Sequence, residues 1–376
     1  MNRIEKLIAE RCQDGVPRIP LSEVAEFKAG KSLKKEDRLP GPYRVVSAST
    51  ANAATHIVAN FPGDVVTVAT HGLAGYVSYW DSPIFLSNNV ILLQFNRSVV
   101  PRFAFFVLSS CNRQIAKMVR EGGVPFLDVS AFKRMLIPVP PIEIQREIVD
   151  ILDSFTRLEA ELEAELEARK AQYSFLRNML LNFEFSAKNV SVNLLGEERF
   201  DVQEKRLGDI ALIKTGRKLE GAFSGGLLPY VNGGVEPSGW VSCANNPGMV
   251  ITIPSRGSVG IVGFQWDQFW LGPLCYAVAP KEGIDPRFLY HQLKRQQARL
   301  VALQQTGSIP ALNKKELVGF VIDVPPLEVQ RRIADVLDDF DELVNDLSSG
   351  LPAEIAARRQ QYEYYRDRLL TFPEKK

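Results

Sequence analysis

The sequence predicts an α+β protein with two small domains, joined by two long antiparallel helices and related by an approximate internal two-fold axis. The first observation is an internal repeat with an offset of 185 residues. Pro62-Gly63 recurs as Pro247-Gly248, and Pro101-Arg102-Phe103 recurs as Pro286-Arg287-Phe288. The second is a long amphipathic segment after each copy. Solenoid repeats have periods of about 20–50 residues, so this longer period indicates a duplicated domain with its connecting helix.

Each copy is expected to begin with a short strand and a glycine turn, Leu21 to Gly30 in the first and Leu207 to Gly216 in the second. Further strands are expected at Val65–Ala69, Tyr76–Trp80 and Val90–Phe95, and at Val250–Ile253 and Ile261–Phe264. Glycines at 72, 75, 257 and 260 fall in the loop between two of these strands, where a positive φ is expected. Asp285-Pro286 predicts a helix start, since Asp caps helices and proline suits their first turn. The helix is expected in both copies, ending at Gly122 in the first and at Gly307 in the second.

The apolar spacing changes after Pro140-Pro141. Residues three and four apart then form one helical face, with members that include Ile144, Ile148, Leu152, Phe155, Leu158, Leu162 and Leu166. About 40 residues in a helix form a rod of about 60 Å. The second rod contains Gly350 and Pro352, which should interrupt it. Two such helices most simply bury their stripes against each other as an antiparallel coiled coil. A purely structural pair and a combined spacer and docking surface are both compatible with the pattern.

The predicted segments follow from these changes in pattern. They are a first domain at 1–141, a long helix at 142–183, a linker at 184–200, a second domain at 201–326 and a second long helix at 327–376, interrupted near 350–352.

Charge is segregated along the chain, although its net value is only +1. Residues 1–141 carry 17 Lys and Arg against 11 Asp and Glu, and residues 200–326 carry 13 against 10, while the helical segments are acidic. Such a distribution fits a polyanion at the domains and another partner at the helices, although ordinary surface variation would also produce it. The four cysteines show no metal-ligand spacing, and we expect reduced thiols in a cytoplasmic protein without a zinc site or membrane span.

Catalytic motifs are not evident in the sequence. Gly30-Lys31-Ser32 ends like a phosphate-binding loop, but Ala25 occupies the position of the required first glycine. None of the three histidines has a partner repeated in both copies. We therefore expect that the chain is not an enzyme by itself.

The repeated loops are better candidates for binding nucleic acid. The segment from Thr70 to Gly75 matches Ser255 to Gly260 in its glycines but not in the side chains between them. An arginine such as Arg256 can bridge guanine in a major groove, while hydroxyls and lysines hold phosphates. A tight hairpin with one surface arginine and a solvated lysine face are the plainer alternatives. The candidate contacts are Lys28, Lys31, Lys34, Lys35, Thr70 and His71 in the first copy, and Lys214, Arg217, Lys218, Asn232, Ser255, Arg256, Ser258, Thr306, Ser308, Asn313 and Lys314 in the second.

The chain resembles the specificity subunit of type I restriction-modification systems. The resemblance rests on the doubled Val-Pro-Pro-Ile/Leu-Glu-x-Gln-Arg-x-Ile-x-Asp-x-Leu-Asp at 139–153 and 324–338, with Thr-Gly-Ser-Ile-Pro-x-Leu-Asn at 306–313 and Pro-Tyr-Val-Asn at 229–232. It departs from the family at 121–128 and 43–47.

The resemblance implies two target-recognition domains, each reading one half of a bipartite site in double-stranded DNA. The helices between them would dock two methyltransferase subunits, through residues such as Gln145, Arg146, Phe155, Gln330, Arg331 and Phe340. Those subunits would use S-adenosylmethionine to methylate adenine at N6, so no cofactor is expected on this chain. A helicase-nuclease subunit can join in this family. A DNA-binding module of another methyltransferase complex and a protein scaffold without a DNA role are the rival functions.

A tandem unit of four residues, Leu-Glu-Ala-Glu, begins at Leu158 and again at Leu162 in the first long helix. Each unit adds about 6 Å, close to two base-pair rises along DNA. We predict that deleting one unit changes the gap between the two half-sites and leaves the half-sites intact. A charged helix with leucines for its partner is the simpler interpretation.

Overall fold

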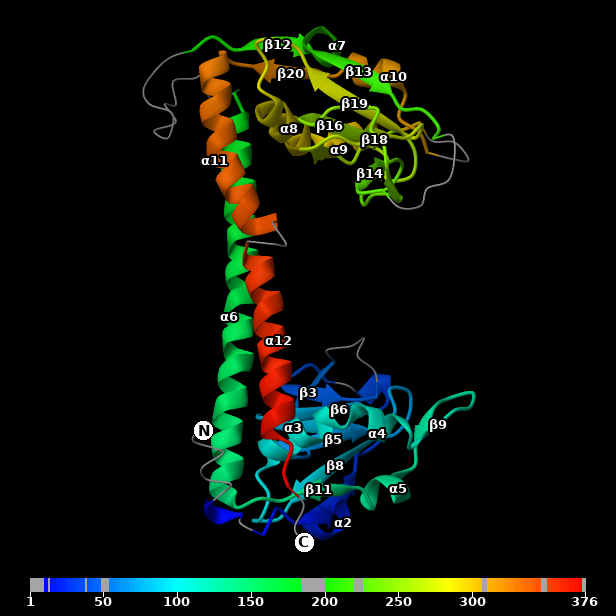
Figure 1. Ribbon diagram of the computed structural model, residues 1–376. Helices are drawn as coiled ribbons and strands as arrows, with labels where there is room; N and C mark the ends of the chain where they lie inside the picture. Colours follow the sequence, from blue (N-terminus) through cyan, green and yellow to red (C-terminus); the bar gives the residue numbers. More distant parts are fainter. Residues whose placement is uncertain are drawn as a thin grey trace. The chain divides into compact units, whose positions relative to one another are not determined.

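The computed structural model (Figure 1) describes residues 10–12, 14–37, 39–48, 54–183, 200–219, 226–305, 310–345 and 350–373. The chain divides into two compact units, one formed by Met1–Leu162 with Ile355–Lys376 and the other by Glu163–Glu354. The first boundary therefore falls inside the tandem unit. Each unit combines one domain and the start of its own long helix with the end of the long helix from the other half.

A four-stranded antiparallel sheet in the order β2–β8–β5–β6 forms the centre of the first unit. Its strands are β2 (Ala25–Ala29), β5 (Val65–Ala69), β6 (Val77–Trp80) and β8 (Val90–Phe95). All residues of β5 are buried, because α3 (Pro101–Ser110) packs on this part of the sheet. The other elements are β1 (Arg18–Pro20), α2 (Leu21–Val24), η1 (Lys35–Asp37), β3 (Tyr43–Val46), β4 (Thr55–His56), β7 (Ile84–Leu86), α4 (Asn112–Ala116), β9 (Val119–Arg120), β10 (Phe126–Leu127), α5 (Val129–Lys133) and β11 (Leu136–Pro138).

The second unit repeats this arrangement, with a sheet in the order β13–β19–β16–β17 and a small three-stranded sheet, β15–β14–β18, that matches β4–β3–β7. Its domain elements are β12 (Gln203–Arg206), α7 (Leu207–Ile210), β13 (Ala211–Thr215), β14 (Leu228–Val231), β15 (Trp240–Val241), β16 (Val250–Pro254), β17 (Gly263–Gln265), β18 (Trp270–Leu271), β19 (Cys275–Pro280), α8 (Pro286–Arg295), α9 (Gln297–Ala302), α10 (Lys314–Val318) and β20 (Val321–Val324). The capped start of α8 is confirmed, since the Asp285 side chain accepts from the backbone N–H groups of Arg287 and Phe288.

Two local predictions were wrong in part, since the expected opening strands exist as β2 and β13 but fill only the second half of each segment. The expected opening strands begin instead with the helical turns α2 and α7, in which the first and fourth residues are buried (Leu21 and Val24 in the first copy). Burial at that spacing fits a helical turn and not the alternation of a strand. The helices after the sheets are also shorter than expected, because α4 ends at Ala116 and the chain returns as the β9–β10 hairpin.

The long helices are α6 (Ile142–Leu181), α11 (Leu327–Asn345) and α12 (Leu351–Leu369), so two separate helices stand in the second half. Pro352 lies in the first turn of α12, where proline is tolerated, and the Gly350 carbonyl accepts the first helical hydrogen bond from Ala353 at 3.0 Å. Residues 346–349 and most of the predicted linker lie outside the described residues.

The ends of the long helices are exchanged between the two halves. In the first unit Leu369, Leu370 and Phe372 join the core of the first domain, where Phe372 meets Phe103 at 6.5 Å between ring centroids. The equivalent residues of the first half, 189 positions earlier, are Leu180, Leu181 and Phe183, and they pack with Phe288 in the second unit.

Helices α6 and α12 run antiparallel inside the first unit. Glu159 pairs with Arg359 at 2.6 Å, and Phe155 stacks on Tyr365 at 5.4 Å between centroids, so residue numbers rise on one helix as they fall on the other. The expected continuous stripe was wrong in part: α12 buries only Ile355 and Leu369, and Leu158 of α6 is 43% exposed.

Candidate nucleic-acid interface

Loops from five parts of the second domain meet at one end of its four-stranded sheet. Each loop is joined to the next by a hydrogen bond from a backbone N–H to a backbone carbonyl oxygen. These bonds run from Arg217 to Leu271 at 3.1 Å, Gly272 to Val231 at 2.7 Å, Ser258 to Gly233 at 2.8 Å, Ser255 to Leu274 at 2.8 Å and Leu312 to Ser255 at 2.9 Å. We call residues 216–218, 231–234, 255–258, 272–274 and 311–314 the second loop end. It brings together most of the predicted contacts of that copy, which are spread over about 100 residues of sequence.

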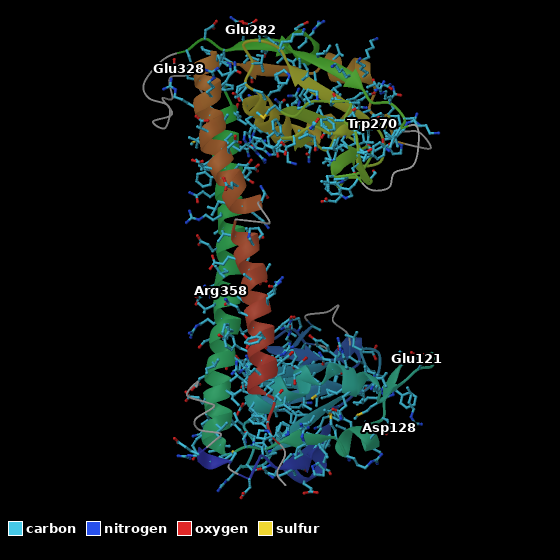
Figure 2. All side chains as sticks on the ribbon, in the orientation of Figure 1. Glu121, Asp128, Trp270, Glu282, Glu328 and Arg358 are labelled. Carbon is cyan, nitrogen blue, oxygen red and sulfur yellow. The ribbon has the colours of Figure 1, made fainter. Side chains whose placement is uncertain are left out.

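The first domain has an equivalent first loop end, formed by residues 30–31, 46–48, 70–73, 87–89 and 125–127. Its bonds include Lys31 N–H to Leu86 O at 2.9 Å, Ser87 to Val46 at 2.9 Å, Thr70 to Asn89 at 2.7 Å, Leu127 to Thr70 at 2.8 Å and Gly72 to Pro125 at 3.2 Å. Figure 2 labels Glu121 and Asp128 in the β9–β10 segment that supplies residues 125–127. The two ends therefore share one backbone framework.

Glycine is required at the turn in both loop ends, as the sequence predicted. Gly72, Gly75, Gly257 and Gly260 have φ angles of 68°, 85°, 78° and 74°. A Cβ atom at Gly257 would lie 2.4 Å from the carbonyl oxygen of Gly233, whereas one at Gly72 would lie 3.1 Å from the oxygen of Ala48. The second loop end is thus the more tightly closed of the two.

The side chains on this common framework differ. At the first loop end His71 is exposed and its ring stacks on Phe126, with the centroids 6.4 Å apart. At the second, Arg256 is exposed, and Arg217 lies 5.3 Å from the ring centroid of Trp270. Below the loops, the Tyr276 hydroxyl donates to Leu312 O at 3.0 Å, and burial raises its pKa, so this phenol stays neutral. The first surface is mainly aromatic, and the second carries guanidinium groups.

Several predicted contacts have structural roles. Thr70 and Ser255 are buried in the loop framework, so Ser255 does not present a hydroxyl at the surface as expected for a phosphate contact. Asn232 Oδ1 accepts from the backbone of Leu274 at 2.9 Å. Asn313 precedes α10, but its side chain is exposed and makes no capping hydrogen bond, so it stays available as a surface contact.

Exposed basic residues lie close to both loop ends. Lys31, Lys214, Lys218 and Lys314 are exposed, and Ser258 is half-buried. Lys28 pairs with Glu26 at 3.4 Å and Lys34 with Glu36 at 3.7 Å, which are weak exposed ion pairs that a phosphate can replace. Thr306, Ser308 and the side chain of Lys35 lie outside the described residues.

Two of the predicted docking residues face inward instead. Gln145 is fully buried and receives the Val100 N–H at 2.8 Å while donating to Ser98 O and Pro140 O. Gln330 makes the equivalent bonds in the second unit. Its side chain accepts from the Asp285 N–H and donates to the carbonyl oxygens of Gly283 and Pro325. These side chains tie each helix start to its own domain because their hydrogen-bonding groups are used internally. Arg146 and Arg331 are exposed, and Phe155 and Phe340 are half-buried.

An arginine–aspartate pair that the sequence analysis missed also fixes each helix to its domain. Arg102 donates to Asp153 at 2.6 and 2.8 Å, and Arg287 donates to Asp338 at 2.6 to 3.0 Å. Arg287 is enclosed by three aromatic rings, with Tyr290 nearest at 4.4 Å. The signal was present, because Pro-Arg-Phe and the aspartates lie in the 185-residue repeat.

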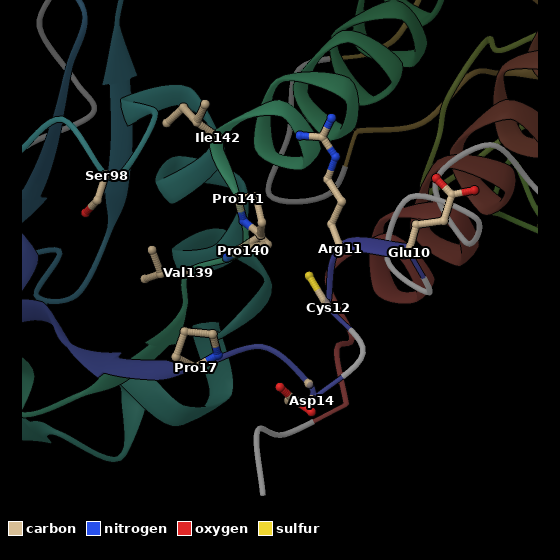
Figure 3. Close-up of a pocket in the computed structure, with 11 residues that line it drawn as sticks. Glu10, Arg11, Cys12, Asp14, Pro17, Ser98, Val139, Pro140, Pro141 and Ile142 are labelled. Atoms are coloured by element: carbon tan, nitrogen blue, oxygen red, sulfur yellow. The ribbon is translucent and has the colours of Figure 1, made fainter.

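A hollow recurs at the start of each long helix. The first has a volume of about 630 Å³, and Figure 3 shows Arg11 and Cys12 on one side of it and Pro140, Pro141 and Ile142 on the other. The second, about 970 Å³, is lined by the equivalent Pro325, Pro326 and Leu327 with residues of β12. Arg11, which lines the first hollow, also pairs with Glu143 in the first turn of α6 at 3.3 Å.

Metal-ligand clusters and membrane-spanning helices are both absent from the described ranges. These ranges contain no group of three or more His, Cys, Asp or Glu residues able to hold a metal ion, and none of their helices is long and apolar enough to cross a membrane. The four cysteines are free thiols, and burial raises the pKa of Cys275 to about 12.

Each copy of the duplicated domain has its loops at one end and a long helix fixed at the other. This arrangement is typical of a recognition protein with two equivalent binding domains. The profile of the type I restriction modification DNA specificity domain matches residues 14–168 and 200–357. The EcoR124I/EcoR124II type I restriction enzyme specificity subunit of Escherichia coli is 32% identical over 305 residues, 72% of this chain and 71% of that protein. The chain therefore belongs to the type I restriction-modification specificity subunits, and its function is recognition of DNA sequence.

Solved structures agree on the fold. The S subunit of a type I restriction-modification system from M. genitalium superposes with a TM-score of 0.73 at 20% identity, covering 94% of this chain and 96% of that one. A chain from a structural study of complex assembly and conformational transition in the type I system gives 0.54 at 19% identity, with 95% and 97% covered. These structures confirm the predicted fold class, while the profile match and the Escherichia coli relative confirm the family.

Proposed function

We propose that each loop end reads one half of a bipartite site in double-stranded DNA. The observation that supports this is the common backbone framework with different exposed side chains, His71 with Phe126 at one end and Arg256 with Arg217 at the other. A guanidinium can bind guanine O6 and N7 together, while lysines such as Lys31 and Lys214 contact phosphates without regard to sequence. In this proposal the shared backbone framework positions the exposed side chains, and the identity of those side chains determines which bases are bound.

The same proposal assigns the chemistry to partner subunits. This chain would direct two methyltransferase subunits, which hold S-adenosylmethionine and methylate adenine at N6, and a helicase-nuclease subunit would cut unmodified DNA. The chain itself contributes recognition and no catalytic group, and it acts in the cytoplasm. Its long helices support this division of labour, since they are anchored to the domains through Gln145 and Gln330 and leave other faces exposed.

Sequencing of methylated adenines in the host genome tests the function. We expect one bipartite motif that disappears when this chain is deleted, and an unchanged methylome would contradict the proposal. Deletion of residues 162–165, one Leu-Glu-Ala-Glu unit within α6, should alter the gap between the half-sites by about two base pairs, since four helical residues span about 6 Å. Altered half-site bases with an unchanged gap would exclude the spacer interpretation.

A further inference from the structure

The first loop end exposes a cluster of large apolar side chains. Tyr76 is 58% exposed, Val124 61%, Leu73 41% and Phe126 39%. The exposed ring of His71 stacks on Phe126 within this group. Single exposed apolar residues are ordinary, whereas several gathered at one place mark a surface that binds something. We call Leu73, Tyr76, Val124 and Phe126 the apolar cluster.

Two segments distant in sequence build the apolar cluster. The turn at 70–76 supplies two of its residues, and the hairpin of β9 and β10 supplies the other two. Gly72 N–H donates to Pro125 O at 3.2 Å, and His71 forms an antiparallel β-bridge with Phe126. The side chains are therefore held on a hydrogen-bonded backbone. Figure 1 shows the β9 hairpin extending away from the sheet of the first unit, so the cluster lies on a projecting element.

The shape and the charges of this hairpin suit the major groove of DNA. Strands β9 and β10 form a two-stranded antiparallel ribbon, which the major groove, about 12 Å wide, admits. Exposed cations surround the hairpin, namely Arg113 and Lys117 from α4 and its end, and Lys31 on the neighbouring loop. These cations can contact the phosphates at the edges of a groove. Glu121 at the hairpin tip is unsuited to phosphate and favours a position at the base edges.

The major groove offers apolar side chains a specific partner. Among the groups that unmodified bases present there, the C5-methyl of thymine is the apolar one. Resting on the function proposed above, we propose that the apolar cluster recognises thymine through this methyl group in the half-site bound by the first domain. Val124 and Phe126 of the hairpin cover the methyl groups, and Leu73 and Tyr76 extend the apolar surface beside them.

The second domain lacks this chemistry at the equivalent positions. Ser258 stands for Leu73, Ala311 for Phe126, and the half-buried Ile261 for Tyr76, while the equivalent of Val124 lies outside the described residues. The second loop end thus presents smaller or polar groups beside its arginines. Loss of thymine methyl groups should therefore weaken binding at one half-site and not at the other.

The test measures DNA binding by the full chain co-purified with its methyltransferase subunits, on the bipartite duplex that methylated-adenine sequencing identifies. Thymines are replaced one at a time by deoxyuridine, which keeps the base pair and lacks only the C5-methyl. We expect about a fourfold loss of affinity for each methyl that the cluster covers, since burying one such group contributes about 0.8 kcal/mol. The losses should fall in one half-site. Val124→Ala with Phe126→Ala should make thymine and deoxyuridine equivalent there.

A matched control is available in the same domain. Ile57 is apolar and 53% exposed, and its backbone lies beside Gly41, at the end of β3 opposite to the first loop end. Ile57→Ala should therefore keep the full difference between thymine and deoxyuridine. Melting temperatures report folding, and Val124→Ala alone, at the exposed hairpin, replaces the double variant if that protein unfolds.

The other outcomes separate this proposal from the one on which it rests. Equal binding of thymine and deoxyuridine in both half-sites, or a difference that persists in the double variant, would overturn thymine recognition alone. Uniform weakening of all duplexes with the thymine preference intact would indicate a minor-groove wedge instead. A double variant that keeps its thymine preference but loses its methyltransferase subunits would make the cluster a protein contact. A complex without preference for either half-site would contradict the proposed function itself.

Discussion

The two loop ends differ in side chains while their backbones coincide. Thr70 O receives Leu127 N–H at 2.8 Å in the first, and Ser255 O receives Leu312 N–H at 2.9 Å in the second. The exposed residue that follows each of these carbonyl groups differs: it is His71 in the first domain and Arg256 in the second. If these side chains read DNA as proposed, each can change without loss of the backbone hydrogen bonds that hold its loop, although His71 also bonds to the Thr70 hydroxyl at 3.1 Å.

The arginine–aspartate pairs that fix each domain to its long helix differ in how deeply they are buried. The side chain of Arg287 is 9% exposed in its pair with Asp338, whereas that of Arg102 is 24% exposed beside Asp153. His291 adds a bond to Asp338 at 2.7 Å in the second unit, at the position where the first has Phe106. The second domain is therefore fixed to its helix by the more buried polar network.

Breaking that network should give the largest effect. Arg287→Ala leaves Asp338 without its principal partner in a half-buried site, and we expect a loss of about 3 to 5 kcal/mol in the free energy of unfolding. Arg102→Ala, in the more exposed pair, should lose about 1 to 2 kcal/mol. Urea unfolding of both variants measures the difference, and equal losses would show that burial does not separate the two supports.

Substitution of the turn glycines should follow in size. Gly257→Ala forces a side chain onto a φ of 78° and within 2.4 Å of a backbone oxygen, so we expect a cost of about 2 to 3 kcal/mol. Gly72→Ala meets its nearest atom at 3.1 Å and should cost about 1 kcal/mol. Thermal melting provides the measurement. A larger loss for Gly72→Ala would contradict the tighter closure of the second loop end.

Truncation of the exposed readers should change DNA binding without changing stability. Arg256→Ala should lose about 1 to 3 kcal/mol at one half-site and relax its base preference, while the other half-site is unaffected. His71→Ala should act on the opposite half-site. Binding of duplexes with one half-site randomised measures both, at fixed salt. Uniform weakening across all sequences, with a smaller salt dependence, would instead identify Arg256 as a phosphate contact.

The smallest effect concerns acid stability. Burial lowers the pKa of His291 below its usual 6.5, despite the hydrogen bond to Asp338. The unfolded chain therefore binds a proton more readily, so stability is complete above about pH 6.5 and falls as pH decreases below it. His291→Phe, which copies Phe106, should reduce this acid sensitivity, because phenylalanine takes up no proton on unfolding. Unfolding curves at pH 7.5 and 5.5 test it, and an unchanged difference between the two would refute the assignment.

Local chemistry made much of the fold predictable. Strands β5 and β8 lie where alternating and apolar runs placed them, and the cap at Asp285 and the positive φ glycines have local causes. The opening segments were predicted only in part: β2 and β13 are strands, but a four-residue window could not separate the helical turns that precede them from a strand. The docking prediction failed for Gln145 and Gln330 because a repeated polar residue at a helix start can serve a partner or its own domain equally well.

The sequence by itself determined the duplication, the glycine frame, the helix faces and the family. Those properties follow from repeated residues and from periodicities that act within a few positions. Only the tertiary structure decided which distant segments meet: the five loops at each end, the arginine–aspartate supports, and the exchange that packs Phe372 on the first domain and Phe183 in the second unit. These contacts join residues far apart in the chain, and their partners are chosen by the packing of the whole unit.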